Sequence, residues 1–299
     1  MAFPIGSWIK ALRLRTLPLA LAVTGMGNLL AYQQNGFRWS ILVFSLLTTL
    51  LLQILSNLAN DYGDSIHGAD LVERKGPSRA VQSGLISKQA MFQAILLLVA
   101  ASLLSGLWLL WISFNTDWVH LLPVFGLGLM AISAAYFYTN GSKPYGYQAM
   151  GDISVFLFFG LVAVLATYYL HTKTLELRLI LPATAMGFWS TAVLNVNNMR
   201  DMPSDRMGGK ETIPLKFGLA GAKRYHLFLV LGGWLCIVVF AIMEHQLAWL
   251  GFIPGSLLMA KSLVGVLKTT EHEKLDPFLK PQALGTLVAV LGMWLAVVL

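Results

Sequence analysis

The sequence predicts an all-α polytopic membrane protein with about nine transmembrane helices. Hydrophobic residues make up 57% of the 299-residue chain and charged residues only 12%, and the mean hydropathy is +0.68. Because a soluble domain carries about 25% charged residues, this composition excludes a cytosolic enzyme, a disordered chain and a fibrous repeat. Cys236 is the only cysteine, which excludes a disulfide-stapled secreted fold.

Each predicted helix is a run of about 20 mostly apolar residues, the length needed to cross the hydrocarbon core. The first run is too long for the apolar core of a signal peptide and lacks a convincing cleavage site, so we expect it to remain as a helix. The long polar stretches 61–88 and 199–224 are expected to be loops that carry function. The runs lie at 16–35, 39–60, 89–113, 118–139, 150–171, 177–198, 225–243, 246–267 and 281–299.

The basic residues predict the orientation of these helices. Of the 21 lysines and arginines, 17 fall on the side of the N-terminus; Arg38, Lys173 and Arg178 fall on the other side, and Lys261 lies within a span. The positive-inside rule therefore predicts a plasma (inner) membrane protein with a cytoplasmic N-terminus. This asymmetry explains the net charge of +7, so no nucleic-acid partner is expected, and no obligatory protein partner is implied.

The acidic residues gather in two clusters on that same side. The pairs Asn57/Asp61 and Asn197/Asp201 share a spacing of four residues and lie 140 residues apart. Duplication of a four-helix unit, helices 1–4 and 5–8, followed by one extra helix, would produce this offset within a single domain 1–299. The clusters comprise Asp61, Asp64, Asp70 and Glu73 after the second span, and Asp201, Asp205 and Glu211 after the sixth.

Each cluster predicts a metal-binding helix end. On a helix, Asn57, Asp61 and Asp64 fall within about 60° of one another, and Asn197, Asp201 and Asp205 within about 80°. Pro203 is expected to bend or end the second of these helices. Clustered carboxylates repel unless cations bind between them, and hard oxygen ligands suit Mg²⁺, which commonly bridges to substrate phosphates. Four nearby basic residues are candidates for phosphate contacts: Arg79, Lys143, Arg206 and Lys210.

These motifs resemble those of the UbiA superfamily of intramembrane aromatic prenyltransferases. Asn60, Asp61 and Asp64 match the first motif of that superfamily in register, while Asp70 stands two residues later than the motif's last aspartate. Asp201 and Asp205 match the second motif, which Lys210 follows after a double glycine.

Other stretches resemble one branch of the superfamily, the 1,4-dihydroxy-2-naphthoate polyprenyltransferases. They are Lys10 to Pro18, Arg79 to Gly84, Tyr138 to Gly146 and Gly151 to Gly160, and the likeness covers almost the whole chain. The resemblance implies a nine-helix ring with a cytoplasmic polar cap. It also implies transfer of a polyprenyl group from its diphosphate to 1,4-dihydroxy-2-naphthoate with decarboxylation, giving a demethylmenaquinol in menaquinone synthesis.

The resemblance also implies roles for individual residues. Mg²⁺ would be held by Asp61, Asp64, Asp201 and Asp205, with the amides Asn57, Asn60 and Asn197 beside the substrate. Arg79, Lys143 and Lys210 would hold the diphosphate, and the Tyr138 ring would face the carbocation. Asp70 and Asp152 are the candidates for the base.

Alternatives remain at the level of the sequence. Arg79, Lys143 and Lys210 would also be explained as residues that set the membrane topology. Tyr138 would also be explained as an anchor at the membrane interface, and Asp152 as a helix cap. A secondary transporter would explain duplicated units and membrane-edge acids, and prenyltransferases for 4-hydroxybenzoate or haem share the same motifs. A CDP-alcohol phosphotransferase is excluded, because its Asp-Gly-x-x-Ala-Arg signature is absent.

Overall fold

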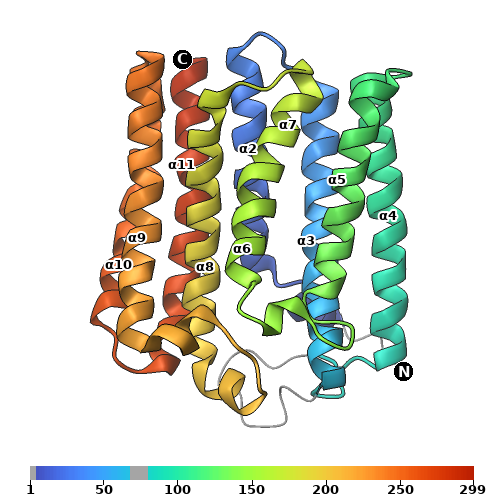
Figure 1. Ribbon diagram of the computed structural model, residues 1–299, viewed down its shortest axis with the longest axis vertical. Helices are drawn as coiled ribbons and strands as arrows, with labels where there is room; N and C mark the ends of the chain where they lie inside the picture. The colour runs from blue at the N-terminus through green and yellow to red at the C-terminus, as the bar shows by residue number, and fades with distance from the viewer. Residues whose placement is uncertain (1–4, 68–79) are drawn as a thin grey trace.

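The computed structural model describes residues 5–67 and 80–299, and these form a bundle of long helices that run side by side (Figure 1). Nine helical stretches of the described chain are long and apolar enough to cross a membrane, as the sequence predicts. The long helices are α2 (Leu17–Gln33), α3 (Trp39–His67), α4 (Lys88–Phe114), α5 (Trp118–Phe137), α8 (Ile180–Met207), α9 (Ile213–Glu244), α10 (Ile253–Lys268) and α11 (Leu279–Val298). Shorter segments are α1 (Ile5–Ala11), η1 (Leu14–Thr16), η2 (Tyr145–Tyr147), η4 (Leu177–Leu179), η5 (Leu247–Phe252) and η6 (His272–Phe278).

The fifth span consists of three consecutive segments. They are α6 (Gly151–Val155), the π-helical turn η3 (Phe156–Val162) and α7 (Ala163–Thr172). Gly160 in η3 lies so close to α8 that a Cβ atom there would come within 2.6 Å of the Gly187 Cα. The widened turn therefore packs backbone against backbone on α8, and π-turns of this kind are frequent at functional sites.

The prediction of a long loop over 199–224 was wrong. Helix α8 continues to Met207 and α9 already begins at Ile213, so the non-helical backbone is confined to the short connection between them and to a kink inside α9 at Gly218 (φ 67°, ψ 170°). Helix α3 likewise runs seven residues past the predicted end of its span, and it carries Asp61 and Asp64 on a helix, as their spacing predicts. A hydropathy window finds the part of a helix that lies in hydrocarbon, whereas backbone hydrogen bonding continues into water.

Pro203 does not end α8, which continues to Met207. A proline has no N–H to donate to the carbonyl four residues earlier, here that of Met199. His272, in η6, bonds that carbonyl through Nδ1 at 2.8 Å. Since a carbonyl only accepts, the ring nitrogen is the donor, and a side chain from another segment replaces the missing helical bond.

The packing of the helices is uneven. The largest hydrophobic core joins α2, α7, α8, α9 and α11 around the fully buried Trp189 and Trp249. Helix α5, by contrast, has no buried residue and packs along α3 and α4. This unevenness leaves one inner face of α5 beside an open cavity rather than against a core.

The three basic residues predicted on the far side all have partners there. Arg38 donates to carbonyls at the C-terminal ends of α4 and α7 at 2.9–3.2 Å, where the helix dipoles favour a cation. Lys173 pairs with Asp117 at 2.9 Å, and Arg178 pairs with Glu244 at 2.8 Å. At this end of the bundle, therefore, carboxylates neutralise Lys173 and Arg178, while backbone carbonyls bind Arg38.

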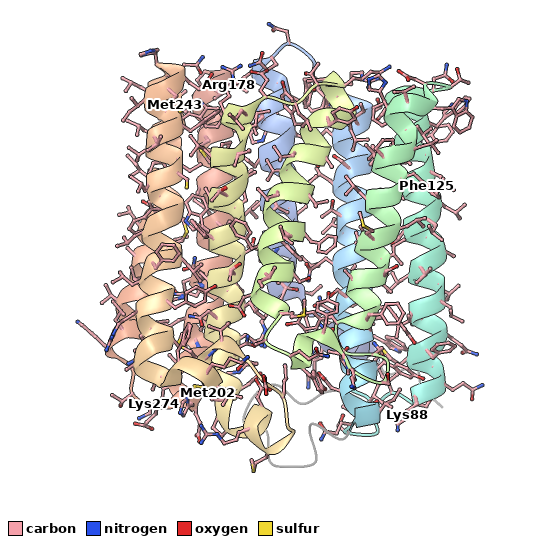
Figure 2. The ribbon with its side chains drawn as sticks, in the orientation of Figure 1. Lys88, Phe125, Arg178, Met202, Met243 and Lys274 are labelled. Carbon is pink, nitrogen blue, oxygen red and sulfur yellow. The ribbon has the colours of Figure 1, made fainter. Side chains whose placement is uncertain are left out.

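The two ends of the bundle differ in their chemistry. Figure 2 shows Arg178 and Met243 at one end, and Lys88, Met202 and Lys274 at the other. The second end holds the C-terminal ends of α3 and α8, and with them both acidic motifs (Figure 1). Both motifs therefore lie at the same end of the molecule.

Candidate active site

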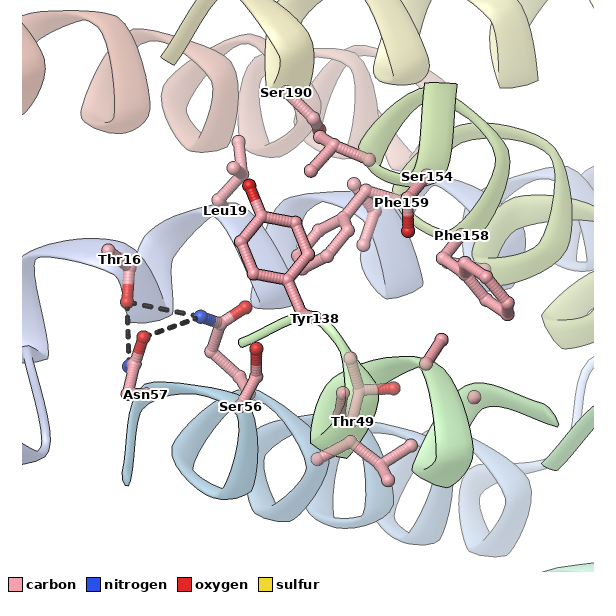
Figure 3. Close-up of a pocket in the computed structure, with 18 of the residues that line it drawn as sticks. Thr16, Leu19, Thr49, Ser56, Asn57, Tyr138, Ser154, Phe158, Phe159 and Ser190 are labelled. Atoms are coloured by element: carbon pink, nitrogen blue, oxygen red, sulfur yellow. Dashed lines mark hydrogen bonds between the residues drawn. The ribbon is translucent and has the colours of Figure 1, made fainter. Parts of the chain in front are cut away.

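A cavity of about 370 Å³ opens inside the bundle between α2, α3, α5, the α6–η3–α7 stretch and α8. Polar residues line the end near the two acidic motifs: Arg13, Arg15, Thr16, Asn57, Asn60, Asp64, Tyr138, Thr139, Tyr145, Asn197, Asn198, Asp201 and Lys210. Toward the other end the lining is mostly apolar, with Val23, Leu109, Val124, Leu127, Val162, Ala163, Ala166 and Leu170. Figure 3 shows Tyr138, Phe158, Phe159 and Leu19 around this space. The cavity therefore joins a polar end to a long apolar channel.

Three residues of the first motif face the cavity. Asn57, Asn60 and Asp64 all line it, as their spacing along α3 favours. Asp61 is not among the lining residues and is 2% exposed, and its Oδ2 accepts a hydrogen bond from the Ala80 N–H at 3.0 Å. Its other oxygen, Oδ1, is buried with no hydrogen-bond partner in the described part of the chain. A buried carboxylate oxygen without a hydrogen-bond partner is available to bind a cation.

The Asn57 side chain holds the N-terminal segment against the cavity. Its Nδ2 donates to the Leu12 carbonyl at 2.9 Å and to Thr16 Oγ1 at 3.0 Å, and its Oδ1 accepts from Gln53 Nε2 at 3.3 Å (Figure 3). The turn that carries Arg13 and Arg15 is thereby fixed beside α3. Both the nitrogen and the oxygen of the Asn57 amide are therefore hydrogen-bonded to other residues of the protein.

A glycine brings the end of α5 onto the first motif. A Cβ atom at Gly63 would lie 2.6 Å from both the carbonyl oxygen and Oγ1 of Thr139. The Thr139 hydroxyl in turn lies 3.1 Å from the Ala59 carbonyl and 3.2 Å from Asn60 Oδ1. The glycine between Asp61 and Asp64 therefore permits the contact that fixes the lining of the cavity.

The second motif carries a buried ion pair. Arg200, whose side chain is 2% exposed, donates to Asp201 through Nε at 2.7 Å and through Nη2 at 2.8 Å. The same Nη2 donates to Asn197 Oδ1 at 2.7 Å, and Nη1 donates to Asp276 of η6. Asp201 and Asn197 both line the cavity. A guanidinium at such a position neutralises one of the motif's carboxylates.

Two loops close over the polar end of the cavity. The backbone of Glu211 pairs with that of Tyr147 and Ala149, with N···O distances of 2.9 and 3.1 Å. The Tyr147 hydroxyl donates to Asp64, and Lys210 Nζ lies 5.6 Å from the centre of the Tyr147 ring. Lys210 Nζ is also 3.6 Å from Asp205 Oδ1. Tyr147 therefore connects the first acidic motif to the second.

The Tyr138 ring lies at the boundary between the polar and apolar parts of the cavity (Figure 3). Burial, and then the charges of Asp152, Tyr145 and Asp205, raise the pKa of its phenol. Asp152 itself is buried at the start of α6 and does not line the cavity.

The structure gathers most, but not all, of the predicted site residues. Seven line one cavity: Asn57, Asn60, Asp64, Tyr138, Asn197, Asp201 and Lys210. Asp61 and Asp205 lie beside it, and Lys143 is exposed on the loop before η2, away from the lining. Asp70 and Arg79 lie outside the described residues.

The polar residues at the site that were not predicted to act there include Arg15, Tyr147, Arg200 and Asp276. Arg200 directly precedes Asp201, and Arg15 lies within the stretch Lys10 to Pro18 that resembles the family, so each had a signal in the sequence. Asp276 precedes the last helix, and nothing in its sequence surroundings indicated a role.

The donor set fits a divalent cation shared with a substrate. No group of three or more acidic, histidine or cysteine side chains within residues 5–67 and 80–299 is arranged to hold a metal alone. Mg²⁺, however, is commonly bound by one or two carboxylates together with substrate phosphates. Each motif supplies such a pair on one helix, and Asp61 contributes a buried oxygen without a partner.

Comparison with known proteins agrees with this architecture. The model of the UbiA prenyltransferase family matches residues 20–284. The chain is 42% identical over 298 residues to the 1,4-dihydroxy-2-naphthoate octaprenyltransferase of Escherichia coli, covering 97% of this chain and 96% of that protein. It is 36% identical over 233 residues to the protein of the same name from Mycobacterium tuberculosis, covering 78% and 77% of the two chains.

Solved structures share the fold at low sequence identity. A UbiA homologue from Aeropyrum pernix aligns with a TM-score of 0.65 and 15% identity, over 92% of this chain and 96% of that one. A UbiA homologue from Archaeoglobus fulgidus, solved with GPP and Mg²⁺, aligns with a TM-score of 0.60 and 18% identity, over 94% and 98%. With the family model and the close relatives covering nearly the whole chain, this protein belongs to the UbiA prenyltransferase family.

Proposed function

We propose that this protein transfers a polyprenyl group from polyprenyl diphosphate to 1,4-dihydroxy-2-naphthoate, with loss of the carboxylate, to give a demethylmenaquinol for menaquinone synthesis. The observation that carries this proposal is the single cavity that joins a carboxylate-bearing polar end to an apolar channel. The names of relatives 36–42% identical to this chain support the naphthoate as the acceptor.

The two parts of the cavity suit the two parts of a prenyl diphosphate. Burying each CH₂ group gains about 0.8 kcal/mol, so the isoprenoid chain favours the channel lined by Val124, Leu127 and Val162. The diphosphate then lies at the polar end, where Arg15 and Lys210 supply donors. The allylic carbon is thereby positioned between the two regions, near the Tyr138 ring.

Asp61, Asp64, Asp201 and Asp205 would hold Mg²⁺ at the polar end. When bound, the metal neutralises the charge that develops on the diphosphate as the allylic C–O bond breaks. The Tyr138 π-face stabilises positive charge on the allyl fragment. A C–C bond then forms between the allyl fragment and the electron-rich naphthol ring as diphosphate leaves. The prenylated ring carbon loses its proton, and the carboxylate leaves as carbon dioxide with a proton taking its place on the ring.

We also propose a location in the plasma membrane with the acidic motifs on the cytoplasmic side, because most of the basic residues lie at the same end as those motifs. The described part of the chain contains nine stretches able to span a bilayer, so the protein is a multi-pass membrane protein. A soluble diphosphate and a lipid-soluble chain meet at such a membrane edge.

Purified protein incubated with 1,4-dihydroxy-2-naphthoate and geranyl diphosphate tests this proposal. We expect a prenylated, decarboxylated naphthoquinol, detected by mass spectrometry as such or as the quinone that oxygen in air forms from it, with Mg²⁺ and none with EDTA. Asp64→Asn and Asp201→Asn should each lower the rate at least 100-fold, whereas Asp117→Asn, at the opposite end of the bundle, should retain it. A folded protein that transfers no prenyl group to any acceptor would favour a transporter instead.

A further inference from the structure

We propose that Asp276 is a positioning residue that holds the Arg15 guanidinium at the cavity for the diphosphate of the substrate. This inference rests on the proposed function. Arg15 lines the polar end of the cavity, and its Nη1 donates to Asp276 Oδ1 at 3.0 Å and to Oδ2 at 3.4 Å. Asp276 comes from η6, 261 residues further along the chain, so this contact is a feature of the fold.

Asp276 is itself fixed by a more deeply buried group. Its Oδ1 also accepts from Nη1 of Arg200, whose side chain is 2% exposed and is held by Asp201 and Asn197. Arg15 and Asp276 are both about one-third exposed, with side-chain exposures of 32% and 39%. In the series of contacts Arg200–Asp276–Arg15, Arg200 is therefore the most firmly held residue, and Arg15 is the one that reaches the cavity.

Charge balance explains why a carboxylate is needed between the two arginines. Two guanidinium groups that converge on the same region repel each other, and the shared Asp276 oxygen offsets that repulsion. Among the described residues Asp276 engages Nη1 of Arg15, which leaves Nε and Nη2 for an anion. An arginine held at one nitrogen can present the other two to a phosphate as a fork.

η6 is tied to the second motif at a further point. His272, four residues before Asp276, bonds the Met199 carbonyl next to Arg200. The segment therefore has two anchors on α8, and its position relative to the motif is fixed. A positioning role for Asp276 follows from this arrangement, since a loosely held segment would not orient Arg15.

Inorganic pyrophosphate, titrated into the detergent-solubilised full chain at constant Mg²⁺, is the probe that tests this inference. We expect Asp276→Asn to raise the Kd for pyrophosphate about 10-fold, and to raise KM for geranyl diphosphate similarly with kcat changed less than about threefold. Asp276→Glu, which keeps the carboxylate, should give an intermediate Kd. In an Arg15→Gln background, Asp276→Asn should add less than a twofold change, because Asp276 acts through Arg15.

Glu271→Gln is the matched control, because Glu271 lies just before η6 and pairs with Lys274 on the exposed side. An unchanged Kd in folded Asp276→Asn, an equal effect of Glu271→Gln, or an undiminished effect in Arg15→Gln would each overturn the inference. If Asp276→Asn does not fold, Asp276→Glu decides: an unchanged Kd then contradicts the inference. Failure of the proposed function is distinguishable, since wild-type protein would bind pyrophosphate and transfer no prenyl group.

Discussion

Gly63, between the two aspartates of α3, leaves no room for a side chain. Gly63→Ala should lower kcat/KM at least 10-fold, because the added Cβ would lie 2.6 Å from Thr139 and would shift Asp64 or Thr139. Overpacking of this kind costs about 1–3 kcal/mol of stability. Gly126→Ala on α5, where a Cβ meets nothing within 4 Å, is the control and should keep full activity. Equal activities of the two variants would contradict the account.

Tyr147 connects the two acidic motifs through Asp64 and Lys210. Tyr147→Phe removes the hydrogen bond to Asp64 and keeps the ring beneath Lys210, so kcat/KM should fall about 10-fold with little change in melting temperature. Tyr169→Phe, whose ring packs on Phe114 near the opposite end of the bundle, should leave both values unchanged. An unaltered rate in Tyr147→Phe would show that this bond does not contribute.

At the scale of residues, the sequence predicted which residues line the cavity better than it predicted the contacts between their side chains. Asn57, Asp64 and Asp201 were predicted because spacing along a helix determines which residues share a face, and Asn60 because it matches the family motif. Asp61 was predicted on the same face as Asn57 and Asp64 but does not line the cavity. Asp276 was missed because its partners, Arg15 and Arg200, lie far away in the chain, and no local pattern encodes that distance. The metal-binding roles of the aspartates remain predictions.

At the scale of elements, Pro203 and His272 form a compensating pair on α8. His272→Ala should lower the melting temperature, because an unpaired buried carbonyl at Met199 costs about 1–3 kcal/mol. Adding Pro203→Ala should restore part of the loss, because the new N–H can bond Met199 within the helix. A double-mutant cycle by thermal melting measures this coupling, and additive effects of the two changes would contradict it.

The sequence predicted the existence of the nine spans but not the ends of all of them. Hydropathy located the apolar part of α9, whereas the helix begins at Ile213, twelve residues before the predicted start, and is kinked at Gly218. The division of the fifth span by a π-helical turn was also missed, because the close contact between Gly160 and Gly187 depends on a neighbouring helix. The internal duplication of helices 1–4 and 5–8 stays a prediction.

At the scale of the whole molecule, the two ends of the bundle predict its orientation. The motif end should face the cytoplasm, because most of the basic residues lie there, while Lys173 and Arg178 at the other end are paired with acids. In a Cys236→Ala background, Ser142→Cys should react with an impermeant thiol reagent only in inverted membrane vesicles. Thr174→Cys should react only in right-side-out vesicles, and the reverse pattern would contradict the orientation.

The central claim concerns the acceptor, and a competition experiment tests it most directly. Purified protein would receive geranyl diphosphate, Mg²⁺ and equal concentrations of 1,4-dihydroxy-2-naphthoate and 4-hydroxybenzoate, with products identified by mass spectrometry. The account predicts that the prenylated, decarboxylated naphthoquinol, or the quinone that air oxidation forms from it, is the dominant product. Dominant prenylation of 4-hydroxybenzoate would contradict the naphthoate assignment while leaving the prenyltransferase chemistry of the cavity in place.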